Sequence, residues 1–335
     1  SLLAAKYLES SPLFNGQECS TRYIDFSTQG IVDPFNTKTS NDILQRWKNI
    51  YTTLQEPIRA QLETLNPKSK FNSEEVWQRA IKAKTLDITR AFLPIGMKTS
   101  VALHMGMRSL NQHLHILKEA NEFEVRDAAA RTLYQLGSRF PSVFSKKYTN
   151  AIDIYRANTT EYTHYITGRT TTKFVQPLKI TDNISGEIYQ YVDVLSSRSK
   201  GAEVPSYFSS LGTVTIDYSL DYGSWRDIQR HRHAVYNQAT MVSDTRVFYS
   251  EYLKQIPSEL KTWVLHEINE QYRSIEQLST EFLDPYSLQY YFPLGNVVNA
   301  KLILTIPQLV YILELRSSQS VHFTLRQLIL SIGSV

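Results

Sequence analysis

The sequence predicts a helix-rich α+β protein that contains an internal repeat. Apolar residues recur at helical intervals over 41–65, which indicates a long amphipathic helix. Apolar and polar residues alternate over 212–218, which indicates a strand. The tetrapeptide Leu-Pro-Ile-Gly at 93–96 returns as Phe-Pro-Leu-Gly at 292–295, and this recurrence, with similar flanking residues, indicates a duplicated unit.

The first half of the chain is predicted to be mostly helical. Asn66 and Pro67 close the helix over 41–65, because proline disfavours helix at the residue before it. Residues 72–75, Asn-Ser-Glu-Glu, can cap a second helix that runs to about Thr85. Both helices are interpreted as packing elements.

The second half is predicted to combine strands with helices. Residues 188–195 and 212–218 are the expected strands, and a helix follows the second of them and leads into Arg230. Residues 248–283 are again largely helical in pattern. We therefore expect the order strand, helix, long helix in this half.

These patterns divide the chain into two repeats and a connector. The first repeat covers residues 1–170, the connector 171–182, and the second repeat 183–335. Residue 1 aligns with about Asp221, so the first repeat is expected to begin midway through the unit.

Net charge and cysteine content exclude some kinds of site and of protein. The net charge is +4, and basic and acidic residues are well mixed, which permits anionic ligands without favouring nucleic acid. A single cysteine, Cys19, excludes an internal disulfide framework and a multi-cysteine zinc site. No apolar run reaches the roughly 18 residues of a membrane span. We expect a cytoplasmic protein that does not enter the membrane.

Histidines in the first repeat do not suggest a metal site. His113 and His115 are two positions apart and so would not share a helix face, and His104 adds no recognised ligand spacing. We predict no bound metal.

The most site-like stretch is Arg230-His231-Arg232, which a hydroxyl residue, Thr240, follows after seven positions. Two guanidinium groups beside an imidazole offer forked donors for phosphate or flavin oxygens. A structural interpretation stands beside this one. Arg226, Arg230 and His233 recur at helical spacing, as on the solvated face of an amphipathic helix whose Val235 faces inward.

This motif resembles the Arg-His-Arg, seven residues, then Ser signature of the flavin-dependent thymidylate synthases. The family follows it with an Asn-Glu-x-Ser-x-Arg-Tyr segment, of which this copy keeps only Asn237 and replaces the serine by Thr240. The missing positions occur near the start of the chain, in Glu18, Ser20 and Arg22. The resemblance implies that Ser20 and Arg22 hold a nucleotide phosphate and that Glu18 orients them or their loop.

The same family order continues in both repeats. By resemblance Arg90, before Leu-Pro, would grip the nucleotide phosphate, and Arg108 would bind flavin with Gln112 in place of a family asparagine. The second repeat has Gln289 in place of Arg90 but keeps Arg316 at the position that contacts the pyrimidine. A structural role for Arg90 as a helix cap, or for Arg108 on a solvated face, is the alternative.

The resemblance implies two tandem copies of the synthase fold, a small antiparallel sheet with long helices, and one composite site. Ser20, Arg22 and Arg90 would surround the phosphate of dUMP; flavin (FAD) would lie among the cationic residues of both repeats: Arg108, Arg230, His231 and Arg232. The implied reaction is reductive methylation of dUMP to dTMP with methylenetetrahydrofolate and NADPH, in a dimer of duplicated chains.

Departures from the family pattern keep a second function open. Asp227 stands where the family has glutamine, and its charge would oppose a phosphate. The alternative is a catalytically degenerate homologue that binds a nucleotide or nucleic acid, or acts as a scaffold. Generic RNA binding has little support, because no aromatic and basic platform accompanies the motif.

Overall fold

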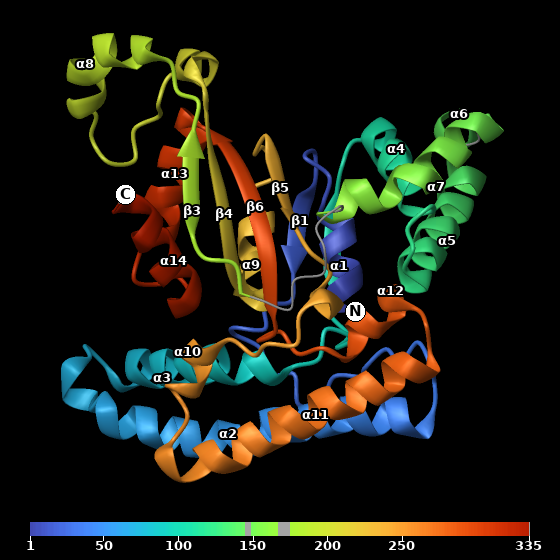
Figure 1. Ribbon diagram of the computed structural model, residues 1–335, viewed down its shortest axis with the longest axis vertical. Helices are drawn as coiled ribbons and strands as arrows, with labels where there is room; N and C mark the ends of the chain where they lie inside the picture. The colour runs from blue at the N-terminus through green and yellow to red at the C-terminus, as the bar shows by residue number, and fades with distance from the viewer. Residues whose placement is uncertain (145–148, 167–174, 335) are drawn as a thin grey trace.

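The strands form two antiparallel sheets in the computed structural model, which describes residues 1–144, 149–166 and 175–334 (Figure 1). The larger sheet has the strand order β3-β4-β6-β5, with β3 at Lys179–Asp182, β4 at Thr213–Asp221, β6 at Val297–Thr305 and β5 at Tyr236–Ala239. The smaller sheet pairs β1, Asn15–Glu18, with β2, Val101–His104. The prediction of a helix-rich α+β protein with small antiparallel sheets is confirmed.

Three groups of helices surround the sheets (Figure 1). The long helices lie together at one end: α2 (Lys38–Leu65), α3 (Glu74–Thr89) and α11 (Lys261–Glu281). A second group packs on the four-stranded sheet: α9 (Tyr222–Gln229), α13 (Ile306–Arg316) and α14 (Phe323–Gly333). The third group lies beside the small sheet: α1 (Leu2–Leu8), α4 (Met107–Leu117), α5 (Phe123–Arg139), α6 (Pro141–Phe144) and α7 (Asn150–His164). Three short helices complete the list: α8 (Val192–Ser196), α10 (Ser250–Leu253) and α12 (Pro285–Leu288).

Helix α2 forms where its apolar period predicts. Thr37 caps its first turn in a reciprocal capping box with Ser40. Eight apolar residues along one face are buried: Ile43, Leu44, Trp47, Ile50, Tyr51, Leu54, Ile58 and Leu62. Ser73 caps α3 as expected. None of the helices in the described ranges is long and apolar enough to cross a membrane.

The two copies of the repeated tetrapeptide face each other across a local two-fold axis. Pro94 and Pro293 form an isolated antiparallel bridge, and a short 3-10 helix precedes each copy, at Arg90–Phe92 and Gln289–Tyr291. The backbone hydrogen bonds between the copies come in reciprocal pairs: Ile95 N to Phe292 O (2.8 Å) with Leu294 N to Leu93 O (2.8 Å), and Gly96 N to Tyr290 O (2.9 Å) with Gly295 N to Ala91 O (2.7 Å). Such reciprocity is typical of a two-fold contact between equivalent surfaces.

Helices near the repeated tetrapeptide also occupy equivalent positions in the two copies. Helices α4 and α13 begin and end at equivalent positions of the two copies. Ser1 caps α1 by accepting from the Ala4 N–H, and Asp221 caps α9 by accepting from the Ser224 N–H. Ser1 and Asp221 thus cap their helices in the same way, while the alignment of residue 1 with Asp221 stays a prediction. Side chains from both copies share one continuous hydrophobic core.

Replacing Gly295 by alanine is expected to destabilise the protein by about 1–3 kcal/mol, because an added Cβ would lie 2.7 Å from the Phe248 ring and 2.9 Å from the Ala91 oxygen. Gly106→Ala is the control, since no atom of the described residues lies within 4 Å of its added Cβ. Urea unfolding of both variants measures the effect. Equal midpoints for the two would contradict the close approach at this contact.

The predicted strand over 188–195 is wrong. These residues form a 3-10 helix, Gly186–Tyr191, followed by α8. Ile188, Tyr191 and Leu195 follow a spacing of three to four and pack on a small cluster of Phe208, Leu211 and Ile306. The apolar residues thus have a helical period, not an alternating one.

The connector predicted at 171–182 lies partly outside the described residues, at 171–174. Its last four residues form β3, which pairs with β4 at the edge of the larger sheet. The predicted strand over 212–218 is confirmed as part of β4.

Candidate functional site

The Arg-His-Arg motif lies at the end of α9 and not within a longer helix. Arg230 is the C-terminal cap of α9, and the chain enters β5 at Tyr236. Val235 N donates to Ile303 O of β6 and its side chain is 59% exposed, so the expectation that it faces inward is wrong. Arg226 is buried and does not lie on a solvated face. Pairing with the sheet ends the helix.

Glu18 joins two of these arginines. Arg226 donates to both carboxylate oxygens of Glu18, at 2.6 and 2.7 Å, and Arg230 donates to one at 2.7 Å. The Glu18 side chain is 2% exposed and that of Arg226 is 9% exposed. Burial by itself would lower the pKa of Arg226, but the Glu18 carboxylate outweighs it and the pKa is raised. The Arg226 guanidinium is therefore charged.

Glu9 is a second acidic partner that the sequence did not reveal. Its carboxylate lies 3.6 Å from the Arg230 guanidinium. Burial, and then the charge of Glu18, raise the pKa of Glu9, while the neighbouring arginines oppose the shift.

Arg22 and Arg90 reach the same region from distant segments. Arg22 forms a bidentate bond with Asp87, at 2.6 and 2.9 Å, and also donates to Ser320 O. Arg90 is 3% exposed, lies 3.8 Å from Asp227 and makes a long contact of 3.4 Å with the Ser224 hydroxyl. No described residue forms a hydrogen bond with its Nε. An unpaired buried donor of this kind is available to a ligand.

These groups line one cavity, which we call the arginine cavity. Its walls include five residues that the sequence predicted and the additional Arg226 and Asp227: Glu18, Ser20, Arg22, Arg90 and Arg230. Its volume is about 30 Å³, enough for roughly one water molecule. The predicted phosphate ligands thus converge, but in a closed arrangement in which carboxylates neutralise the cations.

His231 and Arg316 pair with each other beside this cavity. Arg316 Nε donates to His231 Nε2 at 2.9 Å, and its Nη2 donates to Asp227 O. Burial, and then the charge of Arg316, lower the pKa of His231 to about 4. The imidazole is therefore neutral near pH 7 and accepts the bond from Arg316.

The predicted flavin ligands do not gather in one place. Arg232 lies over the Phe14 ring, 4.7 Å from its centroid. Arg108 and Gln112 are exposed on α4, which packs against α5 and α6, and neither lines the arginine cavity. Within the described part of one chain, these residues do not form a pocket that fits flavin.

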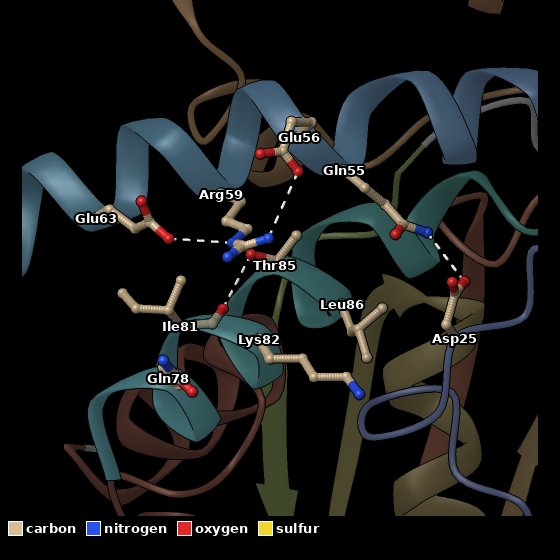
Figure 2. Close-up of a pocket in the computed structure, with 10 residues that line it drawn as sticks. All are labelled: Asp25, Gln55, Glu56, Arg59, Glu63, Gln78, Ile81, Lys82, Thr85 and Leu86. Carbon is tan, nitrogen blue, oxygen red and sulfur yellow. Dashed lines mark hydrogen bonds and ion pairs between the residues drawn. The ribbon is translucent and has the colours of Figure 1, made fainter. Parts of the chain in front are cut away.

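A larger hollow of about 400 Å³ lies between α2 and α3 (Figure 2). Several of its polar side chains pair with one another: Arg59 donates to Glu63 at 3.0 Å and lies 3.7 Å from Glu56. Gln55 donates to Asp25 on the other side of the hollow. None of the predicted site residues lines it. Among the residues whose positions are described, no three His, Cys, Asp or Glu side chains could together hold a metal ion.

Comparison with known proteins gives distant relatives. No family model matches the chain. A UPF0159 protein of Chlamydia muridarum is 24% identical over 98% of this chain and 71% of its own length. A UPF0159 protein of Chlamydia pneumoniae is 23% identical over 96% of this chain and 70% of its own length. Neither name states an activity, so the functional argument rests on the site.

Proposed function

We propose that the chain binds the phosphate of a pyrimidine nucleotide, dUMP or a close relative, at the arginine cavity, in the manner of a flavin-dependent thymidylate synthase. The observation that supports this proposal is the convergence of Ser20, Arg22 and Arg90 with Arg230. These residues come from three regions of the chain, and they were selected from the sequence by the resemblance alone. We place the protein in the cytoplasm, on the strength of its single cysteine.

Phosphate binding at this cavity would require an exchange of partners. The guanidinium groups of Arg22 and Arg90 face Asp87 and Asp227. A phosphate carries more negative charge than a carboxylate and would replace these two side chains as the partner of the guanidinium N–H groups. Arg90 Nε lacks a partner within the described ranges, and the Ser20 hydroxyl oxygen accepts from the Arg22 N–H. Because the cavity is small, nucleotide binding must widen it.

A test of this proposal compares two arginines with the same local geometry. Arg22→Lys keeps the charge but loses the planar fork, so we expect the affinity for dUMP to fall about tenfold or more. Arg46→Lys is the matched control, because Arg46 also forms a bidentate pair, with Glu267, away from the cavity. Calorimetric titration measures both. The absence of dUMP binding in the wild type, or equal affinity in all three proteins, would contradict the proposal.

The full synthase reaction is the second candidate, and the exposure of Arg108 and Gln112 supports it. An exposed pair on α4 is accessible to another chain, so a dimer of duplicated chains can bring it to the Arg230 region of a neighbour. Flavin would supply hydride chemistry there, with NADPH as reductant and methylenetetrahydrofolate as carbon donor. If the chain does not bind flavin, it is instead a catalytically degenerate homologue that retains nucleotide binding. Nucleic-acid binding finds no support in this site.

Flavin binding separates these two candidates. We expect the purified assembly to absorb near 450 nm, roughly as bound flavin does, and Arg108→Ala to lower the affinity for FAD while leaving the unfolding midpoint unchanged. Absorbance titration with FAD, with and without dUMP, gives the affinity. If neither the wild type nor the variant takes up FAD, the synthase reaction is excluded and dUMP binding remains to be judged by its own titration.

A further inference from the structure

A second cavity occupies the position in the first repeat that corresponds to the arginine cavity. Its volume is about 210 Å³, and its walls come from α1, the end of α7, the end of α9 and β5. Since Ser1 and Asp221 are equivalent caps, Lys6 of α1 corresponds to Arg226 of α9, and Ser10 corresponds to Arg230. Lys6 and Ser10 both line the second cavity. The two cavities are therefore lined by two pairs of equivalent residues, Lys6 with Arg226 and Ser10 with Arg230.

Three buried polar atoms in these walls have no hydrogen-bond partner among the residues that the structure describes: His164 Nε2, Arg232 Nε and Asn237 Oδ1. His164 is 4% exposed, so solvent does not satisfy its ring nitrogen. Buried polar groups without partners are uncommon in folded proteins, and three around one cavity indicate that something fills it. The set contains a cationic donor, an amide acceptor and an imidazole.

Lys6 adds a second cation. Its side chain is 2% exposed, and its ammonium group makes one hydrogen bond, to His164 O at 3.3 Å, and lies 3.7 Å from the centre of the Tyr165 ring. An ammonium group has three donors. Its remaining N–H groups are therefore available to a ligand.

The lining charges distinguish this cavity from the arginine cavity. The described residues around it include Lys6 and Arg232 but no carboxylate, whereas Glu18 and Asp227 line its counterpart. Glu122 and Glu9 act on the two cations only from outside the lining. The described lining thus combines a buried cation, Lys6, with a half-buried one, Arg232, and contains no carboxylate, which favours an anionic ligand.

We propose that the second cavity binds a small phosphate monoester that carries a hydroxyl group. Lys6 and Arg232 bind the phosphate, and Asn237 Oδ1 accepts from the ligand hydroxyl. The cavity is somewhat larger than the roughly 150 Å³ that encloses benzene in other proteins, which suits a ligand of about ten non-hydrogen atoms. Exposed Val235 forms part of the wall, so the cavity reaches the surface.

Thr163 offers a test that spares the buried residues. It lines the cavity and is exposed. Thr163→Asp adds a carboxylate next to the proposed phosphate, and Thr163→Asn adds a neutral group of the same shape. In titrations with glycerol 3-phosphate we expect binding by the wild type and by Thr163→Asn, and at least tenfold weaker binding by Thr163→Asp. Arg232→Gln is expected to weaken binding to a similar extent.

The same titrations include results that would contradict the proposal. Absence of glycerol 3-phosphate binding at millimolar concentration, or equal affinity in Thr163→Asp and Thr163→Asn, overturns it. Inorganic phosphate or free glycerol binding as tightly as glycerol 3-phosphate overturns the assignment of a hydroxylated ester. Arg22→Lys must leave glycerol 3-phosphate binding unchanged, which separates this site from the proposed nucleotide site.

Discussion

Replacing Glu18 by glutamine is expected to lower the free energy of unfolding by about 3–5 kcal/mol, because the change leaves the buried guanidinium of Arg226 without its counter-charge. Arg230 loses a partner as well, but its side chain is 43% exposed and water can compensate there. Urea unfolding monitored by tryptophan fluorescence measures the change. The loss reports the cost of an unpaired buried charge more than the strength of the bond itself.

Two comparisons sharpen this prediction. Glu267→Gln removes the partner of Arg46, whose side chain is 38% exposed, and is expected to cost no more than about 1 kcal/mol. Adding Arg226→Met to Glu18→Gln removes the stranded charge and is expected to restore part of the lost stability. Equal losses for Glu18→Gln and Glu267→Gln would mean that the Arg226 pair is not buried in solution.

Acid is expected to destabilise the wild type through buried neutral histidines, and His164 is one of them. Burial, and then the charge of Lys6, lower the pKa of His164 to about 3. Between pH 6.5 and pH 3 the unfolded chain binds a proton that the folded protein does not, so stability falls as pH falls through this range. From pH 7 to pH 4 this single group should cost about 3 kcal/mol.

The variant His164→Phe keeps a ring against Tyr7, whose centroid lies 4.4 Å away, and removes the titrating group. The difference in unfolding free energy between variant and wild type should therefore grow in favour of the variant as pH is lowered from 7 to 4. His266→Gln is the control, because His266 is exposed on α11. Parallel curves for wild type and His164→Phe would show that His164 titrates equally in the folded and unfolded states.

Local patterns predicted much of the fold. The helix over 41–65, the Ser73 cap and the strand ending in Asp221 all depend on interactions within a few residues, which the sequence displays directly. The error at 188–195 arose because a short apolar stretch fits either period, and only the contact with Phe208 and Leu211 decides between them. Likewise, α9 ends at Gln229 because the following residues pair with β6, a distant strand.

The candidate site, like the fold, was predicted from the sequence only in part. The repeat and the resemblance selected Arg22, Arg90 and Arg230, and these do converge. The carboxylates that neutralise them could not be selected, since Glu9 lies more than two hundred residues from Arg230 in sequence and no local pattern connects them. For Asp227 the sequence predicted only that its negative charge would oppose a phosphate. Arg108 matches the family motif in sequence, but in the described part of the chain it is exposed on α4 and does not line the arginine cavity.

The reciprocal contact at Pro94 and Pro293 has a consequence for how such a protein can evolve. In a homodimer every substitution appears on both sides of the axis, so a charge favourable at one pocket is imposed on its image. Linking the halves in one polypeptide removes that constraint. Arg90 faces one pocket while Gln289 occupies the corresponding position, and each pocket is free to specialise for a different ligand.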